Sequence, residues 1–401
     1  MTLLHPRTER DPVEAREAEA LIREARHLRR RRWTVGLLIA AVVGAGTGWA
    51  VAARSPHGSR PARRVVHRES IRGGLPEGAY ANLKVAGPLA VAPSGALYVA
   101  DVDRQQVLVR LPDGRFRVIA GDGTKGISGD GGPAVDAEFV DIADLAVGPD
   151  GSLYVVDGDR VRMISPNGVI STVAGIPGMR MPPPCCSGFA SPPLIVNGTP
   201  ARSVSIDQLN FAAIALSEQG VLYISTGIQL LRLDAGALDV ITTRAIDPPY
   251  DGQPLNNLGQ IAVDAQGNVV VSGGNGWAIW QVAPDGIATV VDDSVPLEAR
   301  RSGGSFSVLE RAPDGVVYGE SASTLLKVHG NRVIPGYSFP ATRRSYFWLT
   351  YFALGPGGTV YADEIPGGSA WEKYQQLRVV RGDRSSVLWR QTSADVARAA
   401  S

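Results

Sequence analysis

The sequence predicts an all-β protein: a six-bladed β-propeller of four-stranded antiparallel blades, preceded by one transmembrane helix. Three observations carry this prediction. A turn glycine followed by one residue, an apolar residue and usually tyrosine recurs six times, 43 to 69 residues apart. A second turn rich in Gly, Asn and Asp follows each copy. Residues 33–53, before the repeats, contain no charged residue. Recurrence at about 40–50 residues is typical of repeat architectures. The six glycines are Gly95, Gly151, Gly220, Gly267, Gly315 and Gly358.

The residues before each turn glycine predict the innermost strand of a blade. The sixth position before it is always large and apolar, and the fifth is alanine in five copies. Apolar residues on both faces indicate a strand buried on both sides, and a repeated small residue indicates crowding there. Glu310 and Arg311 break this pattern in the fifth copy, and we expect each to need its own partner because adjacent strand residues point to opposite faces. The alanines are Ala90, Ala146, Ala215, Ala262 and Ala353.

Three further strands complete each copy, as in 97–101, 107–111 and 116–120 of the first. The last two are joined by turns such as Pro112-Asp-Gly114, whose Asp-Gly pair supplies the positive φ that a tight hairpin needs. Four antiparallel strands per unit, repeated around an axis, predict a propeller over residues 85–392. Residues 393–401 form a C-terminal tail.

Three segments precede the propeller. Residues 1–32 predict a charged helical segment, 33–53 a transmembrane helix, and 54–84 a stalk rich in Arg, Pro and Gly. Twenty-one uncharged residues are enough to cross the roughly 30 Å hydrocarbon core. We therefore expect an uncleaved signal anchor, with a signal peptide cleaved near Ala50-Val51-Ala52 as the alternative. The arginines at 29–32 favour a cytoplasmic N-terminus and an extracytoplasmic propeller in a single-pass protein of the cell membrane.

The distribution of charge and of glycine along the chain indicates which partners the protein could bind. Outside residues 1–32 and 54–68 the chain has a net charge of −7, which gives no support to nucleic-acid binding. The Gly44–Gly48 spacing within the span would permit a dimer through close helix contact.

One stretch resembles a known family. Pro149-Asp-Gly-Ser-Leu-Tyr-Val-Val-Asp157, then Arg160-Val-Arg162 and the run from Gly168 to Gly175, is similar to NHL-repeat six-bladed propellers of the bacterial, membrane-anchored type. The linking stretch Gly121–Ala134 is similar too, with a weaker echo at Asn197–Ala201. The resemblance implies a six-bladed fold and usually binding, and carries no reaction, since the family includes scaffolds, receptors and a few lyases.

The sequence indicates no catalytic residue, cofactor or metal ligand set. Of five histidines only His329 lies in the repeat body, which argues against a histidine-ligated metal. Propellers similar to the gluconolactonase family hold a divalent ion with oxygen ligands, so Ca²⁺ is the alternative. Asp144, Gln260 and Glu310 are expected at the channel mouth, either for such an ion or simply as solvated channel residues.

Loops that carry aromatic and basic side chains predict a binding face. Its members would be Tyr250, Arg343, Arg344, Tyr346, Trp371, Lys373 and Tyr374.

Adjacent Cys185 and Cys186, the only cysteines, could form a strained vicinal disulfide outside the cell, pair between chains, or stay reduced.

Together these features predict a membrane-tethered, non-catalytic module that recognises or scaffolds a protein or glycan outside the cell. The alternative is a lactonase-like or lyase-like enzyme with an oxygen-ligated metal.

Overall fold

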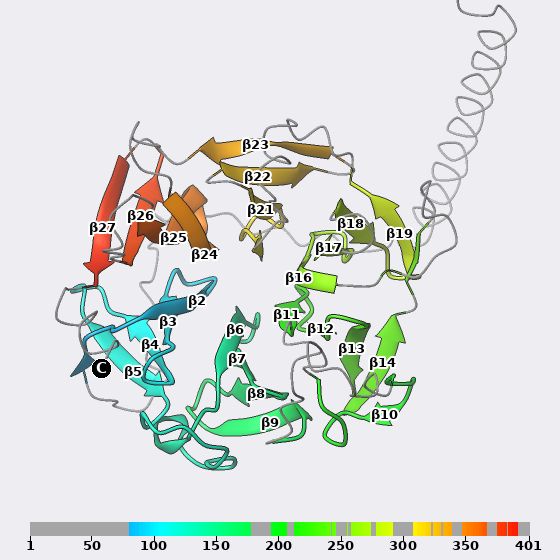
Figure 1. Cartoon of the computed structure of the whole chain (residues 1–401), viewed down its shortest axis with the longest axis horizontal. Helices are drawn as coiled ribbons and strands as arrows, with labels where there is room; N and C mark the ends of the chain where they lie inside the picture. The colour runs from blue at the N-terminus through cyan, green and yellow to red at the C-terminus, as the bar shows by residue number, and fades with distance from the viewer. Residues whose placement is uncertain are drawn as a thin grey trace, which may run out of the picture. The chain divides into compact units, whose positions relative to one another are not determined.

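The computed structural model describes residues 80–177, 194–206, 212–241, 243–245, 255, 258–273, 278–291, 308–321, 324–329, 332–338, 347–366, 375–382 and 384–391. Six sheets, each with four antiparallel strands, are built from these residues and surround a central axis (Figure 1). This confirms the all-β, six-bladed propeller of four-stranded blades. All the described residues belong to one compact unit, Glu69–Ser401. In the part that the structure describes, no helix has the length and apolar character of a membrane span, and residues 33–53 lie outside that part.

Each blade uses four consecutive strands, numbered from the channel outward. Blade 1 contains β2 (Ala86–Val91), β3 (Leu97–Asp101), β4 (Gln106–Arg110) and β5 (Phe116–Ala120), and blade 2 contains β6 (Ile142–Val147), β7 (Leu153–Asp157), β8 (Arg160–Ile164) and β9 (Ile170–Gly175). Blade 3 contains β11 (Ala213–Leu216), β12 (Leu222–Ser225), β13 (Leu230–Asp234) and β14 (Ala237–Ile241). Blade 4 contains β16 (Leu258–Val263), β17 (Val269–Gly273), β18 (Ala278–Val282) and β19 (Ile287–Val290). Blade 5 contains β20 (Leu309–Arg311), β21 (Val317–Ser321), β22 (Thr324–His329) and β23 (Arg332–Ser338), and blade 6 contains β24 (Phe347–Gly355), β25 (Thr359–Pro366), β26 (Gln376–Arg381) and β27 (Arg384–Arg390).

The hydrophobic core lies between neighbouring blades. One cluster joins blades 1 and 2 through residues such as Val107, Ile119, Leu145 and Val155. Another joins blades 1 and 6. Strands of the inner part of a blade are therefore covered on both faces, which explains why they carry apolar residues at consecutive positions.

The segment that precedes the inner strand of a blade lies along the outermost strand of the same blade. Short fifth strands β1 (Tyr80–Ala81), β10 (Thr199–Pro200) and β15 (Arg244–Ala245) pair with β5, β14 and β19. In blade 2 an isolated bridge between Pro133 and Val169 occupies the same place, next to the 3-10 turn η1 (Ala134–Asp136). An exposed edge strand invites pairing with other chains, and these segments protect the edge.

The described ring closes without strand exchange, because every four-stranded blade is consecutive in sequence. The seam between blades 6 and 1 is joined instead by the side-chain amide of Gln375. Its Oε1 accepts from the Ala86 N–H at 3.0 Å, and its Nε2 donates to the Ala86 carbonyl at 2.7 Å. The same Nε2 donates to Asp363 Oδ2 at 2.7 Å, which fixes the amide in place.

Candidate functional site

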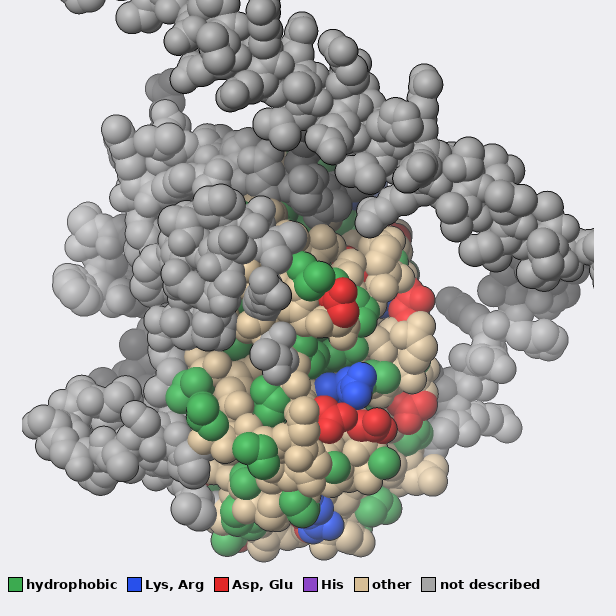
Figure 2. Space-filling model, turned by 90° about the vertical axis from the view of Figure 1, so that its right-hand side faces the viewer, with side chains coloured by type: hydrophobic (Ala, Val, Ile, Leu, Met, Phe, Trp, Pro, Cys, Tyr) green, Lys and Arg blue, Asp and Glu red, His purple; other side chains and the backbone are tan. Residues whose placement is uncertain are grey.

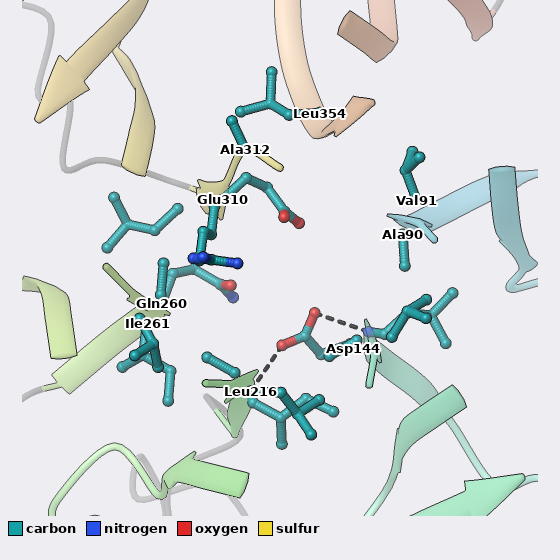
Figure 3. Close-up of a pocket in the computed structure, with 18 of the residues that line it drawn as sticks. Ala90, Val91, Asp144, Leu216, Gln260, Ile261, Glu310, Ala312 and Leu354 are labelled. Carbon is teal, nitrogen blue, oxygen red and sulfur yellow. Dashed lines mark hydrogen bonds between the residues drawn. The ribbon is translucent and has the colours of Figure 1, made fainter. Parts of the chain in front are cut away.

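The central channel contains a cavity of about 200 Å³. All six inner strands contribute to its wall, which is mostly apolar because of the small and branched residues that crowd there. The structure brings Asp144 of blade 2, Gln260 of blade 4 and Glu310 of blade 5 to this cavity, and Figure 3 shows all three side chains pointing into it. Three polar side chains from distant positions in the sequence thus line one cavity.

Asp144 connects two blades. Its Oδ1 accepts from the N–H of Leu145, and its Oδ2 accepts from the N–H of Ile214 in blade 3, each at 2.9 Å (Figure 3). The side chain keeps a partly exposed surface toward the cavity. Burial in the channel wall is the largest effect and raises the pKa of Asp144 to about 7, against the two N–H groups, which lower it.

Glu310 has no hydrogen-bond donor among the described residues, although it points into the same cavity. Burial, and secondly the charge of Asp144, raise the pKa of the Glu310 carboxyl well above its usual value. Its neighbour Arg311 pairs with Glu218 in the turn between β11 and β12. The expectation of separate partners therefore holds for Arg311, whose partner comes from blade 3, whereas Glu310 faces the channel.

These residues suit a divalent cation poorly. Ca²⁺ takes six to eight oxygen ligands. Each Asp144 oxygen already accepts one backbone N–H bond, and Asp144, Gln260 and Glu310 together supply fewer side-chain oxygens than Ca²⁺ requires. Within the described residues no group of three or more His, Cys, Asp and Glu side chains could hold a metal ion.

The aspartates that end the second strand have a structural role in blades 1 and 2. Asp101 accepts from the Lys84 N–H at 2.8 Å, and Asp157 accepts from the Val140 N–H at 2.7 Å. Both carboxylates thus bind the backbone just before the inner strand of their own blade. Asp157 also receives two hydrogen bonds from Arg160, at 3.0 and 2.8 Å.

The glycine-rich stretch after blade 1 also builds the ring. Arg162, fully buried, donates to Asp130 and to the carbonyls of Ser128 and Glu138. Asp130 in turn accepts from the Thr172 N–H at 3.0 Å, so the linker is attached to the outer edge of blade 2. The middle of segment 121–141 lies along the edge of blade 2, because Gly131, Gly132 and Asp130 form hydrogen bonds with its outer strand.

The predicted binding face lies outside the described residues. Tyr250, Arg343, Arg344, Tyr346, Trp371, Lys373 and Tyr374 all fall in segments that the structure does not describe, as do Cys185 and Cys186. The roles of these residues remain predictions. His329, the one histidine of the repeat body, is the last residue of strand β22.

On the side shown in Figure 2, the described hydrophobic side chains are scattered among polar atoms, with a small group of acidic side chains beside a basic one. Exposed single hydrophobic residues are normal for a soluble surface. Leu194 and Val196 are the most exposed large hydrophobic residues described, at 65% and 66%.

Sequence reasoning missed the glutamines that join blades. Gln105 accepts from the Ile142 N–H at 3.1 Å and so connects blade 1 to blade 2, as Gln375 connects blade 6 to blade 1. The two glutamines follow their second-strand aspartates by 4 and 12 residues, counted from Asp101 and Asp363. Because the loop lengths differ, alignment on the turn glycine could not reveal their equivalence.

Solved structures with a similar outline include a streptogramin B lyase, at 11% identity and a TM-score of 0.46, covering 79% of this chain and 87% of that one. A gluconolactonase from Xanthomonas campestris has 12% identity and a TM-score of 0.41, covering 78% and 88%. At these values the likenesses carry no information on what this chain binds.

The teneurins provide the sequence matches. Teneurin-1 of Mus musculus is 36% identical over 103 residues, and Teneurin-m of Drosophila melanogaster is 31% identical over 101 residues. Each match covers 22% of this chain, and the chain spans about 4% of the length of these relatives. The family model described as the Teneurin NHL domain matches residues 116–197, which form the last strand of blade 1, blade 2 and the linkers around it. The similarity to an NHL domain thus covers one blade and its surroundings, in a chain whose described residues form six four-stranded blades.

Proposed function

We propose that this chain is a membrane-tethered, extracytoplasmic NHL propeller that recognises a protein ligand and catalyses no reaction. The tether would be residues 33–53, with residues 1–32 in the cytoplasm, as the uncharged span and the arginines before it indicate. The similarity to the NHL domain of teneurins supports a binding module.

One observation carries the proposal: charged residues of the stretch that resembles NHL repeats are used inside the propeller. Asp130 and Arg162 bind the linker to the outer strands of blade 2, and Asp157 binds the backbone before β6. These side chains already have partners within the chain. Recognition therefore falls to residues that do not repeat, and the aromatic and basic loop residues are the best candidates. We assign the ligand face to Tyr250, Arg343, Arg344, Tyr346, Trp371, Lys373 and Tyr374.

The test uses the full chain in lipid nanodiscs and envelope fragments from the source cells as the probe. We expect binding that survives periodate oxidation of glycans and is lost after protease treatment of the fragments. Trp371→Ala and Tyr374→Ala should each weaken binding at least tenfold, because aromatic anchors dominate interface energetics. Tyr80→Ala is the matched control, since Tyr80 is 59% exposed and lies on blade 1 beneath the Arg115 guanidinium.

Two results would change the proposal. Loss of binding after periodate alone would make the ligand a glycan. Absence of binding to untreated fragments, or equal weakening by Tyr80→Ala and Trp371→Ala, would overturn the assigned face.

The second candidate is a lactonase-like or lyase-like enzyme with an oxygen-ligated divalent ion. The meeting of Asp144, Gln260 and Glu310 in one cavity favours it, while the small number of free oxygen donors disfavours it. Elemental analysis of the full chain after dialysis against micromolar Ca²⁺ separates the two. One tightly held ion per chain, lost in Glu310→Gln, would support the enzyme.

A further inference from the structure

Strand β27 is the outermost strand of blade 6 (Figure 1), and no described segment pairs with its outer side. In blades 1, 2, 3 and 4 another segment of the chain binds the outermost strand. β23 of blade 5 also ends its sheet, but it contains Pro335, and a proline on an edge strand removes a backbone donor. β27 contains neither proline nor glycine, so it has neither form of protection within the described structure.

The backbone groups that β27 presents outward follow from its hairpin with β26. Arg381 and Arg384 are partners on either side of a two-residue turn. A pair that closes so short a turn exchanges both of its hydrogen bonds, so the N–H and C=O of Arg384 face β26. Because the direction of these groups alternates along a strand, those of Ser385 and Val387 face outward. On that side neither residue has a hydrogen-bond partner in the described part of the chain.

The side chains at this end of β27 are open to solvent as well. All four residues 384–387 are exposed, whereas the outer strands of the four covered blades each bury at least one of their first four residues. The other end of β27 is fixed in the fold, because Leu388 and Trp389 pack against the cluster between blades 1 and 6. The exposed edge therefore belongs to a strand that is held in place. A hollow on the surface here is lined by Val379, Arg381, Arg384, Ser385 and Ser386.

The edge is basic and lacks acidic partners. Arg381 and Arg384 lie directly opposite each other, both are exposed, and neither forms an ion pair among the described residues. Like charges in this arrangement destabilise a sheet. Residues 376–390 contain four arginines and one acid, Asp383, although the chain outside residues 1–32 and 54–68 has a net charge of −7. The outer part of blade 6 is thus a basic region of an acidic repeat body, and added carboxylates would relieve its repulsion.

Charge also decides which segment suits this edge. In the covered blades the covering segment precedes the inner strand of the same blade, and for blade 6 that segment is 339–346. It contains Arg343 and Arg344 and no acidic residue, so it would add like charge. A second copy of β27 would do the same, because the strand carries Arg384 and Arg390 and no acidic residue. An acidic strand from another protein has the complementary charge.

We propose that β27 binds an extended, acidic segment of a partner protein, which adds to blade 6 as a fifth, antiparallel strand. The backbone of this segment bonds to the outward N–H and C=O groups of Ser385 and Val387. Its carboxylates lie on the face of the sheet that carries Arg381 and Arg384, and the residues between them point to the other face. The surface uses none of the residues assigned to the loop face, so it is a second docking site and is tested separately from the proposed function.

The first experiment measures peptide binding to the full chain in nanodiscs of phosphatidylcholine, a lipid without net charge. The probe is a capped peptide as long as β27, seven residues, that alternates valine with glutamate. The same peptide with lysine in place of glutamate is the control. We expect the glutamate peptide to bind at least about tenfold more tightly, because like charges across an interface cost affinity. Equal binding of the two peptides would overturn the acidic partner.

Methylated versions of the glutamate peptide test whether the backbone takes part. In an antiparallel pair, residues that bond to Ser385 and Val387 share their face of the sheet, which is the face of the valines. N-methyl groups on two central valines should therefore abolish binding, whereas N-methyl groups on two glutamates should leave it unchanged. Both versions keep the same charge. Equal effects of the two would overturn strand addition.

Two adjacent serines provide matched variants of the chain. Ser385→Pro removes an outward N–H and keeps the ladder to β26, since proline is tolerated where the N–H faces away from the sheet. It should abolish binding of the glutamate peptide. Ser386→Ala keeps an N–H that faces β26, and it should bind like the wild type. Thermal unfolding verifies the fold of both variants. Unchanged binding in Ser385→Pro, or an equal loss in Ser386→Ala, would overturn the assigned edge.

A charge variant tests the arginine pair. Arg384→Glu places opposite charges across β26 and β27, so the fold should be retained. Binding of the glutamate peptide should fall by at least about tenfold, because a carboxylate then meets another carboxylate. Binding that is as tight as in the wild type would contradict the role of Arg384.

Hydrogen exchange in the free chain shows whether the edge is already occupied. The Ser385 and Val387 amides should exchange rapidly and become protected when the glutamate peptide binds, while the Ser386 amide is protected in both states. Protection of Ser385 in the free monomer would assign the edge to another segment of this chain. Protection that disappears on dilution, together with a dimer in sedimentation, would assign it to a second copy. Either result would overturn the external partner.

Discussion

Arg162 and Asp130 are 32 residues apart in sequence and are joined by two hydrogen bonds, at 3.0 and 2.8 Å, from a fully buried guanidinium to Oδ1 of the carboxylate. This contact attaches the linker after blade 1 to β8 of blade 2, and the Thr172 N–H attaches the same carboxylate to the outer strand β9. Asp157 lies farther from the same guanidinium, at 3.5 Å. A chain stretch that looks like a surface loop in the sequence is thus held by a buried charge.

Replacing Asp130 should detach the linker. Asp130→Ala leaves the buried Arg162 with two backbone carbonyls, of Ser128 and Glu138, and with the longer contact to Asp157 as its remaining carboxylate. We expect a loss of about 2–4 kcal/mol in the free energy of unfolding. Chemical denaturation measures this loss. Asp113→Ala is the control, because its ion pair with Arg115 is exposed and contributes little.

The same contact predicts acid sensitivity. Burial works against ionisation of Asp130, but hydrogen bonds from Thr172 and Arg162 outweigh it and hold the pKa of Asp130 below its usual value of 3.8. A lowered pKa gives stability that is present above pH 3.8 and is lost as the pH falls below it. Protection of the Thr172 amide from hydrogen exchange should therefore decline below about pH 4, and an unchanged Thr172 amide at pH 2–3 would contradict this.

The closing seam depends on one amide. Gln375→Ala would remove both bonds to Ala86 and leave that buried backbone unsatisfied, at a cost of about 2–4 kcal/mol in unfolding free energy. Thermal unfolding should show it. Gln391→Ala is the comparison, because its bonds to Gln375 and Lys84 are 3.4 and 3.5 Å long, and it should cost less than about 1 kcal/mol. Equal effects would mean that the seam is carried by the apolar cluster alone.

Gly175 ends β9 with φ +92°, and a Cβ there would meet the Asp159 carbonyl oxygen and the Arg160 Cα. Gly175→Ala should cost more than about 3 kcal/mol, since backbone strain and a clash with backbone act together. Gly151 has a similar φ of +85° with open space around its Cβ position, so Gly151→Ala should cost about 1 kcal/mol. The difference between the two, measured by urea unfolding, isolates the clash.

Glu310→Ala should stabilise the protein above neutral pH, by about 1 kcal/mol or more. Alanine occupies this position in the other five blades, and the change removes a part-buried carboxyl that has no hydrogen-bond donor among the described residues. Arg311→Val should instead destabilise it by breaking the pair with Glu218. Unfolding midpoints at pH 5 and pH 9 test both, with the gain from Glu310→Ala larger at pH 9. A double variant that gains stability and keeps envelope binding would show that neither residue serves recognition.

The sequence by itself determined the propeller and the number of blades, and it predicted that Asp144, Gln260 and Glu310 lie near the channel. Local rules suffice for the fold, because turn glycines mark the hairpins and alternation of neighbours fixes the faces of each strand. Departures from the repeat, such as Glu310, are visible for the same reason.

Only the tertiary structure decided which side chains join the blades. Gln105 and Gln375 reach the next blade from loops of different length, and Asp130 meets Arg162 through a linker that folds back on a blade edge. These contacts depend on where a loop returns in space, which no spacing in the sequence encodes. The raised pKa values of Asp144 and Glu310 likewise arise from burial in the closed ring, which exists only after six blades have assembled.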